Sequence, residues 1–287
     1  MSNTKTKKGF ERNLKKNSMG ATFLNIPYIL WAAIFIIVPM FIVAYYAFTN
    51  NAGEFTLDNF NKLSLYRDSI IDSFVYALVA TVVTLVLAYP FSYFVARSSE
   101  TVQKIIMMLV MLPMWMNLLI MTYSIMNIIE TNGIINSLLV SMGFDKLKII
   151  NTPGAVIFGM VYNYFPYMVL PLVSVLSKID DSLLEASADL GSNAASRFWR
   201  VILPLSVPGV ISGFTMVFVP SVSTFYISQK LGGTNVNMIG DSIEALVKSV
   251  NTIHLGAMLS LVLMVVILIC IMVMNRFSDD SDGGIVL

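Results

Sequence analysis

Residues 184–191 have the sequence LEASADLG, and residues 201–204 have the sequence VILP. They belong to the only long polar, charged segment that lies between two strongly apolar ones in the second half of the chain. Ser182 and Glu185 have the spacing of a capping box, and residues 180–181 add two carboxylates near the same helix N-terminus. The pattern therefore predicts a short helix, and the face expected to be buried consists of Leu183, Ser187 and Leu190.

Glycine, asparagine and proline mark the ends of the helices in this segment. Gly191 stands where a left-handed residue would end the first helix. Asn193 is a suitable cap for a second helix that carries the aromatic and basic residues 197–200, and Pro204 is expected to limit that helix. We therefore expect a helix-turn-helix between two membrane spans, which is a shape suited to docking a partner.

The composition indicates that this segment is surrounded by membrane spans. Of the 287 residues, 56% are hydrophobic and 12% are charged, whereas soluble domains have about 25% charged residues. The apolar residues form six runs, each near the roughly 20 residues that cross a bilayer as a helix. These runs cover residues 21–48, 69–95, 104–129, 153–176, 205–227 and 255–275. The sequence thus predicts an all-α polytopic membrane protein with six transmembrane helices in one domain, residues 21–275.

The basic residues predict how the chain is oriented. With residues 1–20 as a cytoplasmic tail, the inner segments carry twelve basic residues: six in that tail, and Arg97, Lys104, Lys178, Arg197, Arg200 and Arg276. The outer segments then carry six, which are Lys62, Arg67, Lys146, Lys148, Lys230 and Lys248. This distribution satisfies the positive-inside rule, which explains the basic tail more simply than nucleic-acid binding does. It places the loop 178–204 and a C-terminal tail, residues 276–287, in the cytoplasm.

Several kinds of site are missing from the sequence. No acidic residue lies in the middle of a predicted span, and Asp72 is the nearest, although carriers driven by protons or sodium usually have such residues. A glycine-rich phosphate loop ending in Lys-Ser or Lys-Thr is absent, so ATP hydrolysis by that route is not expected. With one histidine, His254, and one cysteine, Cys270, neither a catalytic set nor a metal site is expected. Any energy for transport would therefore come from a partner protein.

The polar segment resembles a known motif. Residues 185–187 are followed after three residues by Gly191 and, after nine more, by residues 201–204. This order is similar to the cytoplasmic EAA loop of bacterial ABC importer permeases, whose pattern is Glu-Ala-Ala, three residues, Gly, nine residues and Ile-x-Leu-Pro. Ser187 and Val201 depart mildly from that pattern, while the spacing is kept. The resemblance implies a type I ABC importer permease-like bundle with a cytoplasmic coupling helix.

The resemblance also implies how energy would reach the chain. A dimer of ATPase subunits would bind ATP and Mg, and this chain would be a transport subunit with no cofactor and no enzymatic activity of its own. The short helix, residues 182–190, would act as a lever between the ATPase and the spans. Glu185 would either meet a basic residue of the ATPase or cap its own helix. The residues implied in coupling are Leu184, Glu185, Ala186, Ser187, Asp189, Gly191, Leu203 and Pro204.

A narrower resemblance concerns the transported solute. Residues 112–123, 132–139, 231–233 and 238–240 are similar to the first permease of spermidine/putrescine importers. This implies a bacterial plasma-membrane complex with a second homologous permease and an extracytoplasmic polyamine-binding protein. Met121 departs from the family, which commonly has Arg at this position. Another small solute, or less plausibly a carrier that acts alone, therefore stays an open alternative.

Aromatic side chains near the proline-broken spans are the candidates for solute contact. Polyamines are flexible cations, and aromatic rings hold ammonium groups through cation–π attraction. The alternative is that these rings only pack in the bundle or lie at the membrane interface. The candidates are Trp115, Tyr123, Tyr162, Tyr164 and Tyr226.

Overall fold

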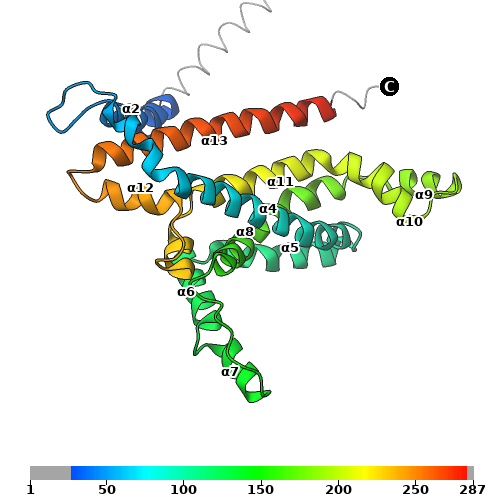
Figure 1. The fold of residues 1–287 in the computed structure, drawn as a ribbon. Helices are drawn as coiled ribbons and strands as arrows, with labels where there is room; N and C mark the ends of the chain where they lie inside the picture. The colour runs from blue at the N-terminus through cyan, green and yellow to red at the C-terminus, as the bar shows by residue number, and fades with distance from the viewer. Residues whose placement is uncertain (1–26, 283–287) are drawn as a thin grey trace, which may run out of the picture.

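The computed structural model describes residues 27–282, so the predicted tail 1–20, the start of the first span and residues 283–287 lie outside the described residues. Within this part the fold is all-helical apart from one isolated bridge between Thr49 and Phe55 (Figure 1). The α-helices are α2 (Val38–Ala47), α3 (Asp58–Asn61), α4 (Arg67–Ala96), α5 (Glu100–Trp115), α6 (Leu118–Ile129), α7 (Ile134–Ser141), α8 (Pro153–Leu176), α9 (Asp181–Asp189), α10 (Ala194–Arg197), α11 (Leu203–Ser223), α12 (Ile239–Val247) and α13 (Ile253–Asp282). Short π-helical segments form η1 (Ala33–Ile37), η3 (Phe198–Ile202) and η4 (Ser228–Gly232), and a 3-10 helix forms η2 (Lys62–Tyr66).

Six helical segments of the described part are long and apolar enough to cross a membrane. They are Pro27–Ala47, Asp58–Ala96, Leu118–Ser141, Pro153–Leu176, Ala194–Ser223 and Ile253–Met274. The predicted spans 69–95 and 153–176 are confirmed by α4 and α8. The all-α polytopic fold follows because a helix satisfies its backbone hydrogen bonds internally, as an apolar medium requires.

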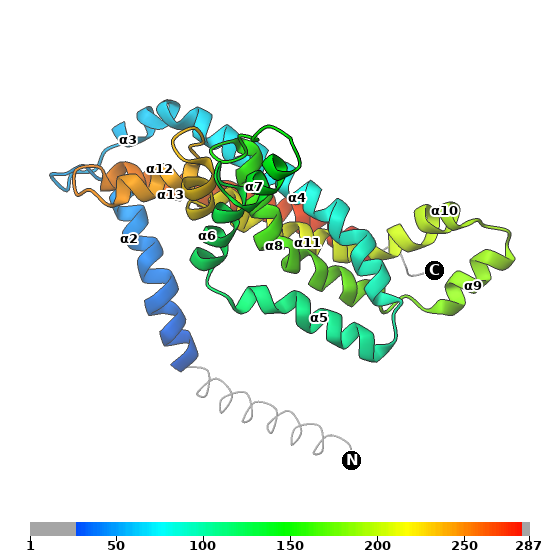
Figure 2. The same ribbon diagram turned by 90° about the horizontal axis from the view of Figure 1, so that it is seen from below.

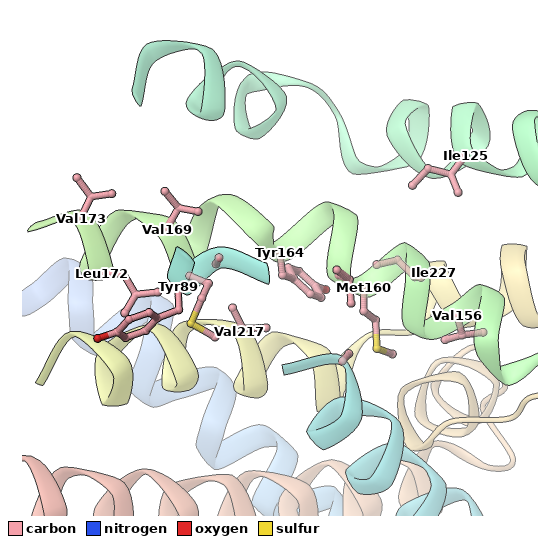
Figure 3. Close-up of a cluster of buried hydrophobic side chains, with 14 of the residues drawn as sticks. Tyr89, Ile125, Val156, Met160, Tyr164, Val169, Leu172, Val173, Val217 and Ile227 are labelled. Atoms are coloured by element: carbon pink, nitrogen blue, oxygen red, sulfur yellow. The ribbon is translucent and has the colours of Figure 1, made fainter. Parts of the chain in front are cut away.

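The centre of the bundle is the packing of α4, α8 and α11 (Figure 3). On α4 the buried face consists mainly of small residues, including Ala77, Ala80 and Ala88, which let the neighbouring backbones approach closely. On α11, Gly213 plays the same role, because a Cβ there would meet the Met168 side chain of α8. These contacts produce a continuous apolar core that runs along the long axis of the bundle.

Most polar groups inside this core are paired, whereas Ser92 Oγ and Asn163 Oδ1 have no hydrogen-bond partner within residues 27–282. The hydroxyl groups of Thr81 and Thr84 donate to backbone carbonyls one turn earlier in α4, at 2.7 and 2.6 Å. The Tyr89 hydroxyl lies 2.7 Å from the Ser206 hydroxyl, which joins α4 to α11. A hydrogen bond between buried hydroxyls fixes the two helices in register, because leaving either group unpaired would be costly.

The outer helices pack on one side of this core. Helix α13 contacts α11 and α12, and α2 lies mainly against α13. Figure 2 shows that α2 diverges from the bundle along its length. Six of its ten residues are exposed, including all of residues 38–42, as expected of a helix that faces lipid or another membrane subunit.

The prediction of one span over residues 104–129 is wrong. Helix α5 ends at Trp115, Met116 and Asn117 are extended, and α6 begins at Leu118. Asn117 starts the new helix because its side-chain oxygen accepts a hydrogen bond from the Leu119 amide at 2.8 Å. Hydrophobicity is continuous through this break, so the apolar pattern alone does not reveal it.

The prediction that Pro204 limits a separate second helix is also wrong. Helix α10 continues through the π-helical turn η3 into α11, so Ala194–Ser223 forms one span. The wider turn before Pro204 accommodates a residue that has no amide hydrogen and whose ring crowds the preceding turn. The same device precedes Pro39, where η1 leads into α2. The predicted span 205–227 is therefore shifted toward the N-terminus.

The last helix extends further than expected. The backbone of α13 remains helical to Asp282, seven residues beyond the predicted end at 275. The C-terminal end of α13 points toward the end of the bundle that carries α9 and α10 (Figure 1).

Candidate coupling site

Helix α9 projects from one end of the bundle, beyond the ends of α4 and α8 (Figures 1 and 2). Arg97, just after α4, ties its base to the core. The Arg97 Nη1 atom donates to the Ile179 carbonyl at 3.2 Å and to Asp181 Oδ1 at 2.5 Å. Ile179 is itself buried in the core cluster. We call residues 178–204 the coupling arm. It is fixed to the core at its base, and most of its length is exposed.

The start of α9 differs from the predicted capping box. Asp180 is the cap, and its carboxylate accepts a hydrogen bond from the Ser182 amide at 3.0 Å. This bond from the Ser182 backbone holds the pKa of Asp180 below its ordinary value. Ser182 lies inside the first turn, and Glu185 is exposed with no hydrogen bond in the described part of the chain. The capping-box prediction is wrong because Asp180, and not Ser182, occupies the cap position, which leaves Glu185 available to a partner.

The end of α9 confirms the predicted glycine stop. Gly191 has a φ of +78°, in the left-handed region that favours glycine. The amide of Gly191 donates to the Ala188 carbonyl at 2.8 Å, and the amide of Ser192 donates to the Ser187 carbonyl at 3.1 Å. This pair of bonds is a Schellman motif, which ends the helix sharply and reverses the chain.

Ser187, which replaces an alanine of the motif, fits this geometry. Its hydroxyl donates to the Leu184 carbonyl at 2.8 Å and so needs no external partner. Asn193 caps the following helix as predicted, because its Oδ1 atom accepts from the Ser196 amide at 2.8 Å. The turn between the two helices is therefore defined at both ends.

The predicted buried face of α9 is wrong. Leu184 is buried, with 8% of its surface exposed, whereas Leu183 and Leu190 are 49% and 89% exposed. Leu184 belongs to the same buried cluster as Ile179 and Ile202, because α9 meets the bundle only near its base. Residues 27–282 do not cover the opposite face.

We call the uncovered face of α9 the coupling surface. Its members are exposed, and they combine apolar and acidic side chains on one short rigid helix. They are Leu183, Glu185, Ala186, Asp189 and Leu190. Apolar side chains in an exposed, ordered arm outside the predicted spans indicate a protein contact.

Other residues predicted for coupling lie at the base of the arm. Leu203 is half-buried against the core cluster, and Pro204 is exposed in the first turn of α11. Nearby, the Phe198 ring meets the Tyr89 ring edge-on with 5.5 Å between centroids. These contacts hold the second helix against α4, so the base of the arm is part of the rigid core.

The structure brings two of the predicted aromatic residues together and separates the others. The rings of Tyr123 and Tyr226 meet edge-on, with 6.3 Å between centroids. Lys230 lies beside both, with its Nζ atom 5.1 Å from the Tyr123 centroid and 5.8 Å from the Tyr226 centroid. The sequence interpretation missed Lys230, although its spacing of four residues from Tyr226 is a signal that it shares a helical face.

The other three aromatic residues have different surroundings. Tyr164 is buried in the core beside Tyr167, in agreement with the packing alternative (Figure 3). Tyr162 borders a groove of about 250 Å³ between α5 and α8, which Pro113 and Phe165 also line. Trp115, at the end of α5, is 80% exposed. These three do not form one site with the Tyr123 pair.

Comparison with known proteins identifies the family. Residues 88–280 match the family described as "Binding-protein-dependent transport system inner membrane component". The chain belongs to this family. It is a permease subunit of an ABC importer and a multi-pass membrane protein, and α9 with its glycine turn lies within the matched region.

Two relatives have the same name, "Spermidine/putrescine transport system permease protein PotB". The protein from Haemophilus influenzae is 36% identical over 225 residues, which cover 75% of this permease and 79% of the relative. The protein from Escherichia coli K12 is 34% identical over 258 residues, which cover 86% and 94%.

A solved structure has the same fold. It is described as a "bacterial alginate ABC transporter in complex with alginate pentasaccharide-bound periplasmic protein". The match has a TM-score of 0.73 at 17% identity and covers 93% of this permease and 96% of that chain. At this identity the likeness concerns the arrangement of the helices.

Replacing Arg97 with Gln is expected to loosen the root of α9. The variant loses the charged contacts to Asp181 and Ile179, which are worth about 1 kcal/mol together. Amide hydrogen exchange within residues 181–190 should therefore become about fivefold faster.

Lys104→Gln is the matched control for this measurement. It removes an exposed ion pair with Glu100 on α5, with no link to α9. Exchange in α9 should not change in that variant. Equal exchange in wild type and Arg97→Gln would contradict the role of Arg97 as the anchor.

Proposed function

We propose that this permease carries polyamines across the bacterial plasma membrane. The observation that carries the proposal is the 34% identity to the Escherichia coli spermidine/putrescine permease over 94% of that protein. Similarity over nearly the whole length covers the spans that would form the path as well as the coupling arm. The path would be completed by a second homologous permease, and in support α2 and α13 have wide apolar surfaces that residues 27–282 leave uncovered.

The proposed complex includes two ATPase subunits and an extracytoplasmic polyamine-binding protein. ATP and Mg would be bound by the ATPase subunits, and this chain would contribute neither a cofactor site nor catalytic residues. Both termini and the loop 178–204 would lie in the cytoplasm. In support, Arg97 follows α4, Lys178 lies between α8 and α9, and Arg197 ends α10. These basic residues are thus next to α9, where the positive-inside rule expects them.

In the proposed mechanism α9 acts as a lever. The coupling surface would sit in a groove of the ATPase, with Leu183 and Leu190 as apolar anchors and Glu185 facing a basic residue. Closure of the ATPase pair would draw two such helices together and switch the path from inward-facing to outward-facing. A lever requires a rigid element whose contacts differ between the two states. The cap at Asp180 and the contacts of Arg97 at the root support α9 as the rigid element.

An alternative substrate has one observation in its favour. Met121 is buried in α6, where the polyamine permeases commonly have Arg. A buried uncharged side chain at this position changes the electrostatics near the outer end of the path. A permease for another small solute is therefore the second candidate.

Uptake by the reconstituted complex tests the proposed substrate. Proteoliposomes that contain both permeases, the ATPase pair and the binding protein should accumulate labelled spermidine or putrescine when ATP is supplied to the ATPase side. An excess of unlabelled polyamine should compete, and an excess of an unrelated sugar should not. Sugar competition without polyamine competition would show that the solute is different.

Replacing Gly191 with Val tests the lever. The left-handed backbone costs about 1–2 kcal/mol for a residue with a Cβ, and nothing lies within 4 Å of the added atom, so the effect is on the turn alone. The variant should retain less ATPase on co-purification and should lose uptake. Gly191→Asn should be milder, because asparagine tolerates this conformation.

Gly143→Val is the control for that experiment. Gly143 follows α7, has a φ of +84° and is equally free of neighbours. The same backbone strain is thus placed far from α9, and co-purification of the ATPase should be normal. Normal uptake and ATPase binding in Gly191→Val would remove α9 from the coupling mechanism.

A further inference from the structure

The Lys230 side chain lies beside two tyrosine rings, Tyr123 and Tyr226, on the side of the bundle away from the coupling arm. Tyr123 belongs to α6, and Tyr226 precedes η4, which carries Lys230. The two rings are in contact, and the Lys230 ammonium lies within 6 Å of both centroids. Helix α6 and η4 lie toward the end of the bundle away from α9 (Figure 1). In the proposed orientation this is the side from which a solute would enter.

No carboxylate in the described part of the chain forms an ion pair with this lysine. Within residues 27–282 the ion pairs are Arg97–Asp181, Lys104–Glu100 and Lys248–Glu244. Glu244, the acid on neighbouring α12, is engaged by Lys248 and accepts from Gln229 Nε2 at 3.3 Å. The Tyr123 side chain raises the pKa of Lys230, which is therefore charged at neutral pH. The ammonium group lies over the two tyrosine rings, and a cation–π contact at an exposed site is weak enough to be reversible.

The backbone around Lys230 is fixed, so only its side chain is free to move. Ser228 and Leu231 are buried, and the Ser228 hydroxyl donates to Asp241 Oδ1 at 2.9 Å. The Leu231 carbonyl accepts from the Asn151 amide at 2.8 Å. Lys230, Tyr123 and Tyr226 are all at least partly exposed. A lysine on a fixed backbone can leave the rings by rotation about its four-carbon stem.

We propose that the Tyr123–Tyr226 pair is a binding site for a primary ammonium group and that Lys230 occupies it until a solute ammonium takes its place. The proposal rests on polyamine transport as the function of the complex. The end groups of putrescine and spermidine are primary ammonium ions, chemically the same as the lysine head. Lys230 would thus act as a tethered competitor that keeps the site filled and selects solutes with an ammonium end.

Two other roles of Lys230 make different predictions. As a simple positive barrier, Lys230 would weaken solute binding whether or not the rings are present. As a structural brace between α6 and η4, it would affect stability and not solute affinity. If Lys230 competes with the solute, its removal should increase the affinity for spermidine only while the tyrosine rings are present.

The test is equilibrium binding of labelled spermidine to the complex of both permeases and the ATPase pair in lipid nanodiscs, without the binding protein. Lys230→Gln should lower the Kd about fivefold, because it vacates a site worth about 1 kcal/mol. Lys230→Arg should keep the wild-type value. Lys62→Gln, which removes an exposed lysine of η2 that forms none of these ion pairs, is the matched control and should have no effect.

A double-mutant cycle separates competition from a charge barrier. Tyr226→Leu should raise the Kd of the Lys230→Gln variant about fivefold and so abolish the gain. Tyr226→Phe keeps the ring, so it should keep the gain and also shows that the segment still folds. An unchanged Kd in Lys230→Gln, or a gain that persists in the double variant, overturns the inference.

Uptake distinguishes this inference from the proposed function. If the wild-type complex takes up polyamine while Lys230→Gln binds it no more tightly, only the ammonium site is wrong. If the wild-type complex neither binds nor takes up polyamine, both are wrong.

Discussion

The close packing of α4, α8 and α11 is the constraint on which the rest of the permease depends. Alanine and glycine on facing sides bring the backbones together, and the Tyr89–Ser206 hydrogen bond fixes the register of α4 against α11. Water is absent from the hydrocarbon region, so helix association relies on such contacts more than on the hydrophobic effect. The coupling arm depends on this core for support, because Arg97 and Phe198 attach it to α4.

The two ends of the bundle combine rigid backbone with exposed side chains. At one end, Asp180 and Gly191 define a short helix that keeps Leu190 outside the fold. At the other end, the buried hydrogen bonds of Ser228 hold η4 in place while Lys230 rests on two rings. A transporter needs both features: a fixed backbone to transmit force, and exposed side chains whose contacts with a partner or a solute can change. In the proposed mechanism the core between them would transmit a displacement with little deformation, because packed interiors are stiff.

Much of this fold and of the coupling arm can be predicted from the sequence. Hydrophobic runs locate α4 and α8, and the Gly191 turn and the Asn193 cap follow from local chemistry. The errors arise where tertiary contacts decide between local alternatives. Periodicity gives α9 an apolar face, but only the position of the arm determines that Leu184 is the buried leucine. Likewise, pairing of Lys230 with Tyr123 joins residues from separate helices, so no local pattern contains it.

Cysteine labelling tests the central claim, that α9 is the surface which receives the ATPase, most directly. A Leu190→Cys variant in a Cys270→Ser background presents one thiol on the exposed end of α9. We expect a membrane-impermeant maleimide to label it in the permease pair alone, and only from the cytoplasmic side. Addition of the ATPase pair should protect the thiol. Equal labelling with the ATPase bound, or labelling from the outer side, would contradict the account.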